Sequence, residues 1–357
     1  MNTFDLRKLV LILALLAFGF GSLFAQISQA VESDEQQLSM LGLSASSTSD
    51  EWIAVYFEQE AKYLDLNIRE VNQAGADILD FIASKVQELA PETFASYYIP
   101  YHEVVPSSTT RTLLDQATAV EPNNSLAFDD YVAQGEVNRD SGMKKKYAQK
   151  LEAASVYSLP TMEYNFNVLN SLPSNAFLIT YGHDDTYPLW IWQEVFGTAP
   201  NVQVINIDLL SNAQYCIDIC QRLNIPNIDA GSLNAQERIK HLLSGQNTNI
   251  YLALTISPSI LKKHSKNLYL TGLALHYAKV NEYNLAQLSG NWENRFARTY
   301  IDVDEPINQN YKLMFTVLAD YYAESNNPEM LNSVEIHLDK KKSKVSKSTS
   351  KKRPAAY

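Results

Sequence analysis

Three short apolar runs in the second half of the chain constrain its fold most strongly. They are Ala176–Tyr181, Val202–Ile207 and Asn249–Ile256, and each is short and apolar, as buried strands are. Residues 186–196 and 213–223 lie between them and have helical spacing. Strand–helix–strand units of this kind place their strands parallel, with a right-handed crossover. The sequence therefore predicts a small parallel, Rossmann-like sheet in which the three runs are neighbours.

Helical patterning dominates the part of the chain that precedes these runs. A helical stripe begins at Trp52 and Val55, and residues 109–155 divide into short helices in pairs. The interval from Pro122 to Ser155 has 34 residues, which is the length of one tetratricopeptide unit. We therefore expect an α/β fold with an additional all-α region, in which tetratricopeptide-like (TPR-like) hairpins flank the sheet. Residues 268–280 are apolar and fit either a helix or a strand.

The amino terminus has the three parts of a secretory signal. Arg7 and Lys8 precede an apolar stretch, and small residues lead to an expected cut after Ala25. The apolar stretch Leu9–Ala25 is shorter than the roughly 20 residues that span a bilayer, and an uncut anchor is the alternative. We expect an exported protein that is periplasmic or associated with the cell envelope.

Changes in composition predict six segments along the chain. They are a signal peptide (1–25), a polar linker (26–49), a helical TPR-like region (50–158), an α/β domain (159–300), a closing helical hairpin (301–339) and a basic, disordered tail (340–357).

The charge is distributed unevenly between the body and the tail. Residues 26–339 contain 19 basic and 39 acidic residues, a net charge of −20, whereas residues 340–353 contain eight basic residues. An acidic body disfavours nucleic acid and anionic lipid. We expect no nucleic-acid partner, and membrane contact only through an uncleaved signal or the basic tail. The sequence leaves the oligomeric state open.

No motif predicts a cofactor or a metal. The chain lacks the glycine-rich dinucleotide fingerprint and the phosphate-binding loop, and its histidines form no pair with ligand spacing. Cys216 and Cys220 are the two cysteines, and they lie on one helical stripe with Ile219 and Leu223. This spacing is typical of core thiols, because a disulfide within one helical face has poor geometry.

The best candidate site lies where the three apolar runs end. Ligands in open α/β sheets collect at the carboxyl ends of the strands, and Thr255 and Ser257 follow the third run. The candidate ligand-binding residues, which follow the first two runs, are His183, Asp184, Asp185, Thr186, Tyr187, Trp190, Asn206 and Asp208. Carboxylates beside aromatic rings suit a hydroxyl-rich ligand or a hard cation. The alternative is that the carboxylates and Thr186 cap a helix and that the rings belong to the core.

Several of these residues also carry a resemblance to a known family. They are Tyr164-Asn165, Asn170–Pro173, Leu178–Thr180, Gly182, Asp185–Trp190, Gln193–Val195, Val202, Val204, Asn206, Leu209, Leu210 and Leu268–Ala274. Together they resemble the soluble carboxyl-terminal region of multi-pass bacterial membrane proteins described as protein O-mannosyltransferase-like. The resemblance covers roughly residues 160–340. It implies a freestanding relative of an extracytoplasmic accessory domain, and it does not imply transferase activity.

Two classes of function follow from these features. The first is an exported, non-catalytic binding or scaffold protein of the bacterial cell envelope, whose partner is a glycan or an envelope protein. The alternative is a sugar-acting enzyme, or a glycosyltransferase accessory subunit, that uses the loop at Asp184 and Asp185.

Overall fold

A computed structural model describes residues 33–65, 70–103, 108–246, 249–280, 284–301 and 305–338. The predicted signal peptide (1–25) and basic tail (340–357) lie outside these residues. Within the described ranges, no helix combines the length and the apolar character that crossing a bilayer requires.

The chain divides after Pro122 into two compact units. The first unit is helical. It contains a helix at 33–40, α2 (Ser49–Tyr63), α3 (Gln73–Leu89), α4 (Phe94–Glu103) and α5 (Ser108–Val120), and two short paired strands, β1 (Leu64–Asp65) and β2 (Glu70–Val71), follow α2. The segment that we expected as a polar linker is partly helical and buries Leu38 and Leu43. Two leucines among many serines are enough to draw this segment into a core.

Local sequence fixes where the helices of the first unit begin. Thr48 and Glu51 form a capping box before α2, with the Thr48 N–H donating to the Glu51 carboxylate at 2.7 Å. Asn72 caps α3 through the N–H of Gly75 at 3.0 Å. A Cβ on Gly75 would lie 2.4 Å from the Cβ of Tyr63, so only glycine fits where α3 starts beside α2.

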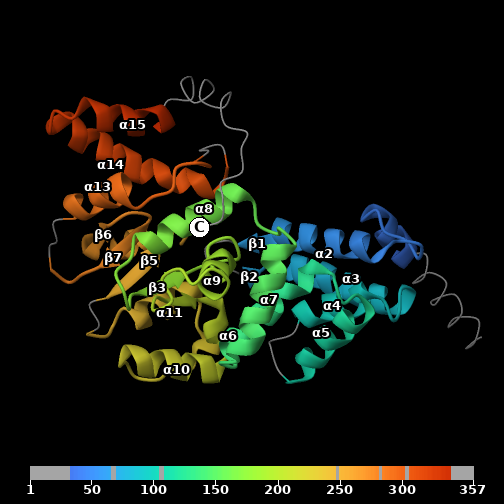
Figure 1. Ribbon diagram of the computed structural model, residues 1–357. Coiled ribbons are helices and arrows are strands. Elements are labelled where there is room, and N and C mark those ends of the chain that lie inside the picture. The colour runs from blue at the N-terminus through green and yellow to red at the C-terminus, as the bar shows by residue number, and fades with distance from the viewer. Residues whose placement is uncertain are drawn as a thin grey trace, which may run out of the picture. The chain divides into compact units, whose positions relative to one another are not determined.

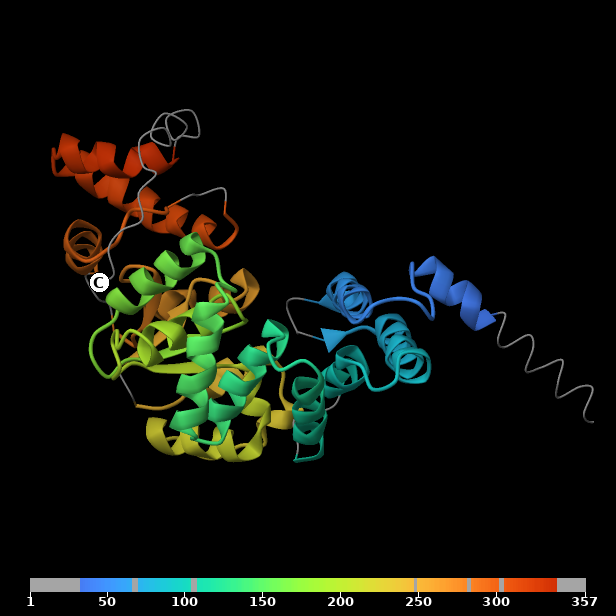
Figure 2. The same cartoon turned by 45° about the vertical axis from the view of Figure 1, so that its right-hand side comes forward.

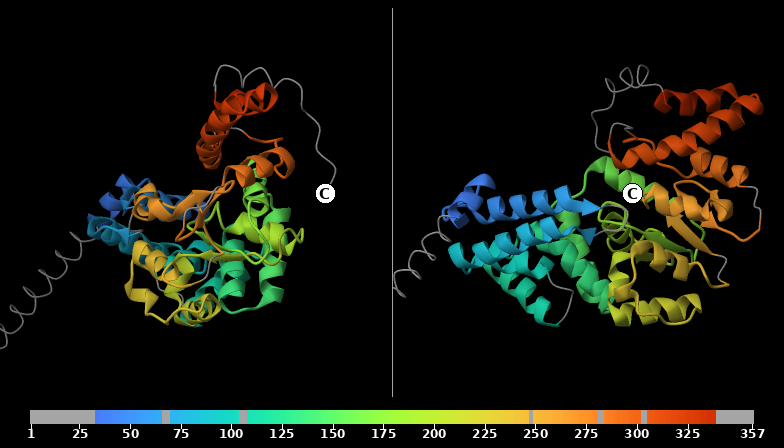
Figure 3. Two further views of the ribbon diagram at one scale, coloured as in Figure 1. Left: turned by 90° about the vertical axis from the view of Figure 1, so that its left-hand side faces the viewer. Right: turned by 180° about the vertical axis from the view of Figure 1, so that it is seen from behind.

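The second unit combines a sheet with helices (Figure 1). Its helices are α6 (Phe128–Val137), α7 (Ser141–Ala153), α8 (Leu159–Asn170), α9 (Tyr187–Glu194), α10 (Ala213–Leu223), α11 (Ala235–Leu242), α12 (Pro258–His264), α13 (Leu285–Asn294), α14 (Tyr311–Glu324) and α15 (Pro328–Leu338). Its strands are β3 (Phe177–Thr180), β4 (Gln203–Asn206), β5 (Ile250–Ala253), β6 (Leu268–Leu270) and β7 (Ala274–Tyr277), in the order β4-β3-β5-β7-β6. Figures 2 and 3 show α10 and α11 below the sheet and α14 and α15 above it.

The predicted pairing of the three apolar runs is confirmed. Strand β3 pairs in parallel with β4 on one side and with β5 on the other. Leu178 lies opposite both Val204 and Tyr251, and all three side chains are buried. The runs are mostly apolar because helices cover the strands, as is usual for parallel strands.

The sheet as a whole is mixed, because two further strands extend the parallel strands at one edge. Residues 268–280, which fitted either a helix or a strand, form β6 and β7, and β7 pairs antiparallel with both β5 and β6. The reversal turns at Gly272, whose φ is +159°. A Cβ there would lie 2.3 Å from the Oγ of Ser171, so glycine permits close approach to α8.

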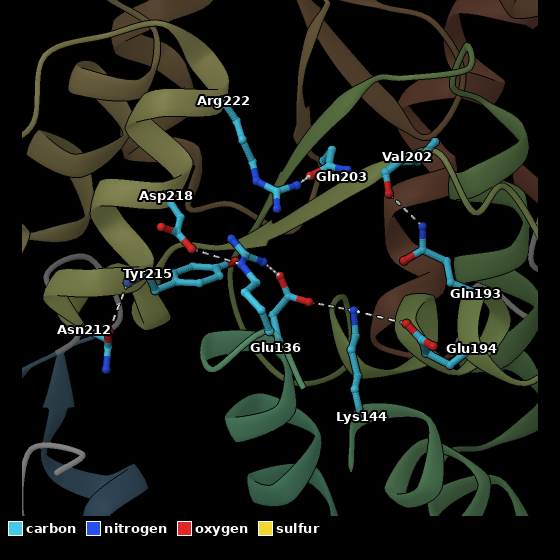
Figure 4. A network of polar contacts seen from close by, with 11 residues as sticks. Glu136, Lys144, Gln193, Glu194, Val202, Gln203, Asn212, Tyr215, Asp218 and Arg222 are labelled. Carbon is cyan, nitrogen blue, oxygen red and sulfur yellow. Dashed lines mark hydrogen bonds and ion pairs between the residues drawn. The ribbon is translucent and has the colours of Figure 1, made fainter. Parts of the chain in front are cut away.

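Ion pairs join the α6–α7 hairpin to two other helices of the second unit. Lys144 lies between Glu136 at 2.7 Å and Glu194 at 3.4 Å, and Arg139 lies between Glu136 at 2.6 Å and Asp218 at 3.4 Å (Figure 4). These contacts link α6 and α7 to α9 and α10. Within the second unit, the hairpin therefore packs against helices α9 and α10, which accompany the sheet.

The predicted core thiols are confirmed within α10. Cys216 and Cys220 are both free and buried, and their sulfur atoms are 4.0 Å apart. Ile219 and Leu223 complete the same buried face.

Candidate functional site

The candidate site lies at the carboxyl end of β3. From β3 the chain crosses to β4 on one side, and it later returns as β5 on the other side of β3. The loops that follow β3 and β5 therefore meet where the direction of winding changes, which is the usual ligand position in an open α/β sheet. The structure brings the predicted residues together at this point, and the side chains differ in what they face.

Asp185 is an internal structural acceptor. Its carboxylate is 4% exposed and accepts the N–H of Tyr181 at 2.8 Å and the hydroxyl of Thr186 at 3.3 Å. The Thr255 hydroxyl donates to the same carboxylate. Because Tyr181 follows β3 and Thr255 follows β5, Asp185 ties the two strand ends together.

Burial raises the pKa of the Asp185 carboxyl group. Desolvation is the largest cause; the hydrogen bonds from Thr255 and Tyr181 oppose it, and the charge of Asp208 adds to it. A raised pKa is typical of general acids, but here the group is enclosed by its donors.

Asp184 points the opposite way from its neighbour. Its side chain is exposed, and its backbone carbonyl accepts the Asn165 side-chain amide at 2.7 Å. The two carboxylates are thus separated by the chain itself: one faces solvent and one faces the core. A mechanism that requires both to reach one substrate does not fit this arrangement.

Thr186 and Asn206 also hold the loop to the sheet. The Thr186 hydroxyl lies 2.8 Å from that of Thr180 and makes no side-chain cap to α9, so the expected capping role is wrong. Asn206 donates to the Thr186 hydroxyl at 3.1 Å and to the Gly182 carbonyl at 3.2 Å. Its carbonyl accepts the Asp208 N–H at 2.8 Å, which fixes the turn after β4.

The two predicted aromatic residues belong to the core. Tyr187 and Trp190 are buried, and their rings meet edge to face at 5.3 Å. The Lys144 ammonium lies over the Trp190 ring at 4.8 Å. Buried rings cannot offer a face to a sugar, so this pair does not form a glycan platform.

His183 is the predicted residue that reaches furthest from the loop. It is exposed, and its Nδ1 lies 3.0 Å from a carboxylate oxygen of Asp129 in α6. Half-buried Tyr157 lies beside the same carboxylates; burial raises its pKa, and the charges of Asp129 and Asp184 add to this effect. Our sequence reasoning missed Asp129 and Tyr157, because both precede the sheet and no spacing relates them to the loop.

Helix α8 supplies buried polar groups that the sequence reasoning did not assign to the site. Asn167 donates to the Ala297 carbonyl and to the Tyr311 hydroxyl, each at 2.7 Å. Glu163 accepts the N–H groups of Thr299 and Tyr300 at 2.9 and 2.6 Å. The signal that could have found them is a run of amides and a carboxylate in an otherwise apolar helix, which requires internal partners.

Helices α8 and α9 carry a second group of apolar side chains, of which Leu159 and Phe196 are exposed and the other three are half-buried. On α8, Leu159, Met162 and Phe166 lie at helical spacing, and Leu159 is 58% exposed. On α9 and just after it, Trp192 and Phe196 continue the surface; Phe196 is 44% exposed. The Trp192 ring lies 4.9 Å from that of Phe166 and 4.7 Å from that of Phe196. We call these five residues the α8–α9 stripe.

The fold and these surfaces define a mixed α/β domain with attached helical hairpins. The model of the family called TMEM260-associated domain 2 matches residues 161–351, more than half of the chain. The chain therefore belongs to this family. The match agrees with the resemblance of residues 160–340 to a carboxyl-terminal domain, here one of a TMEM260-like family. No curated protein and no solved structure matches the chain.

Proposed function

We propose that this protein acts by binding a protein partner, as an exported, non-catalytic module of the bacterial cell envelope. The observation that carries the proposal is the α8–α9 stripe. Contiguous exposed apolar side chains are characteristic of interaction sites. Four of its five residues, Met162, Phe166, Trp192 and Phe196, lie within the residues that the family model matches.

The chemistry of the stripe favours an apolar protein segment over a glycan. The Trp192 indole N–H already donates to the Met162 carbonyl at 2.8 Å, so the ring presents carbon to its surroundings. A sugar needs polar groups that converge on its hydroxyls. An amphipathic helix needs apolar anchors spaced along a groove, and α8 with α9 presents that spacing.

The state of Asp185 supports binding over the alternative of a sugar-acting enzyme. That alternative needs two carboxylates at one substrate, whereas Asp185 accepts three internal hydrogen bonds and Asp184 faces solvent. This arrangement favours a structural role for the loop over a catalytic one.

We further propose that the partner belongs to a membrane-bound glycosyltransferase system of the O-mannosyltransferase-like kind. The family's name describes a domain associated with TMEM260, and the sequence resembles the soluble part of such membrane proteins. The same proposal includes export through residues 1–25. It also includes a Rossmann-like relationship of the β4-β3-β5 sheet and a TPR-like relationship of the α6–α7 hairpin.

Site-specific photo-cross-linking tests the proposed surface. A photoreactive residue at Phe196 should give one discrete adduct with an integral membrane protein, and Phe166→Ala in the same chain should remove that adduct. Leu313 on α14 is 50% exposed and serves as the matched control, which should give no adduct. Equal adducts at both positions, or none at Phe196, would contradict the proposal.

A further inference from the structure

One stretch of the chain reverses the acidic character of the rest. Residues 238–280 contain six lysines and arginines, three histidines and no aspartate or glutamate, in a chain whose net charge is −11. Arg238 is used internally, since it donates to the Ala230 carbonyl at 2.9 Å and to the Ile207 carbonyl at 3.2 Å. The other five cations are lysines, and all five are exposed: Lys240, Lys262, Lys263, Lys266 and Lys279.

The fold gathers these lysines from four elements to one edge. Lys263 in α12 donates to Gln236 in α11, and Lys279 after β7 donates to the Gly245 carbonyl at 2.9 Å, just after α11. The Ala278 N–H donates to the Asn267 carbonyl at 2.9 Å, which places Lys279 near Lys266. We call the five residues the lysine edge.

A histidine beside the lysine edge is affected by its positive charge. His264 lies at the end of α12, and its pKa is lowered by burial and by the charges of Lys263 and Lys240. Glu237 is the acidic residue that directly precedes this stretch. Its carboxylate accepts the Asn234 N–H at 3.1 Å in a capping box. Across the part of the chain that the structure describes, none of the five lysines forms an ion pair.

The lysine edge lies at the opposite end of the sheet from the loop of Asp184. Lys266 precedes β6 and Lys279 follows β7, and Leu268 pairs with Tyr277. In the same sheet Tyr251 of β5 pairs with His276, so this end corresponds to the amino ends of the parallel strands. Asp184 and Asp208 follow the carboxyl ends of β3 and β4. The second unit is thus polarised, with exposed lysines at one end and carboxylates at the other.

We propose that the lysine edge rests on the surface of a bilayer containing anionic phospholipid. Lysine is a point charge on a flexible stem, which suits mobile phosphate groups, whereas specific pairing with protein carboxylates favours the planar fork of arginine. Lysine is also depleted at protein–protein interfaces. Val280, adjacent to Lys279, is 70% exposed and offers an apolar side chain at the same surface. The sequence had placed membrane contact only at the signal and the tail.

Vesicle co-sedimentation of the full chain tests this proposal. The measured quantity is the increase in bound protein when about 30% phosphatidylglycerol replaces neutral lipid. This increase reports the electrostatic contribution to binding, because insertion of an apolar segment would occur with both lipids. Lys262→Gln with Lys263→Gln should reduce the gain by about tenfold or more. The matched control is Lys145→Gln with Lys146→Gln, a second pair of adjacent exposed lysines on a helix, and it should change the gain less than about twofold.

Three results would overturn the proposal. They are no gain with anionic lipid, an equal loss in both variants, or an unchanged gain in the lysine-edge variant. The last result would assign the binding to the basic tail, which both variants retain. Glutamine keeps the helix-forming character of these positions, so both variants should fold. A cross-linked membrane partner at Phe196 would be unaffected by any of these outcomes.

Discussion

Replacing Asp185 with alanine should destabilise the protein without touching an exposed site. The substitution leaves the Tyr181 N–H and the Thr255 hydroxyl without their acceptor in the interior. Each buried unsatisfied group costs about 1–3 kcal/mol. Removing the carboxylate also removes the free-energy cost of burying it, which offsets part of this loss. Burial disfavours the charged form of the group, as its raised pKa indicates. We expect a net loss of about 2–3 kcal/mol in the free energy of unfolding.

Asp184→Ala is the matched control, because the neighbouring side chain is exposed. It should change the free energy of unfolding by less than about 0.5 kcal/mol. Urea denaturation followed by tryptophan fluorescence measures both variants, and the dependence on denaturant should stay constant while the midpoint shifts. Equal effects of the two substitutions would refute the structural role of Asp185. An increase in stability for Asp185→Ala would also refute it, because replacing an active-site residue often stabilises a protein.

The pH dependence offers a second measurement on the same residue. The folded pKa of Asp185 is raised, so its contribution to stability is complete below the unfolded pKa and is lost as pH rises through the folded pKa. Asp185→Asn keeps an acceptor for the Tyr181 N–H and cannot ionise. Its stability relative to the wild type should therefore increase as pH rises through that range. A constant difference between the two proteins would contradict the assignment.

Three further substitutions have expected outcomes. Gly272→Ala would place a Cβ 2.3 Å from the Ser171 Oγ, so it should cost about 2 kcal/mol or more by urea denaturation. Gly135→Ala would place a Cβ 2.6 Å from the Lys144 backbone nitrogen, where α6 meets α7. It should lower the midpoint of thermal unfolding by about 4 °C or more, and an unchanged midpoint would contradict this close packing. Burial lowers the pKa of His337 to about 4, so stability should fall as pH drops from about 6.5 towards 4; His337→Phe should flatten that fall, and an unchanged slope would rule out this residue as its cause.

The sequence predicted the centre of the sheet because three apolar runs with intervening helices have few arrangements. It did not predict β6 and β7, because Leu268–Tyr277 is mostly apolar and its reversal depends on how Gly272 meets Ser171 at the end of α8. It did not predict how the α6–α7 hairpin packs, because the hairpin is held by pairs such as Arg139 with Asp218, which are far apart in the chain.

The sequence predicted the position of the candidate site, but it did not predict which way the side chains of the site point. Asp184 and Asp185 are chemically identical and adjacent, and only the register of the turn after β3 decides which one faces the core. The lysine edge was hidden for a similar reason, since its residues span 40 positions from Lys240 to Lys279 and converge only through the fold. Spacing along the chain predicts elements well, and it predicts the partners of loop side chains poorly.

Recovery of the bound membrane partner from native membranes tests the central claim most directly. Phe196→Ser removes an anchor of the α8–α9 stripe, and Asp184→Asn alters the loop that an enzyme would need. The account predicts that the Asp184→Asn protein binds as much partner as the wild type. The Phe196→Ser protein should bind about tenfold less, which is the loss expected for one apolar anchor. Recovery that falls with Asp184→Asn and is unchanged with Phe196→Ser would contradict it.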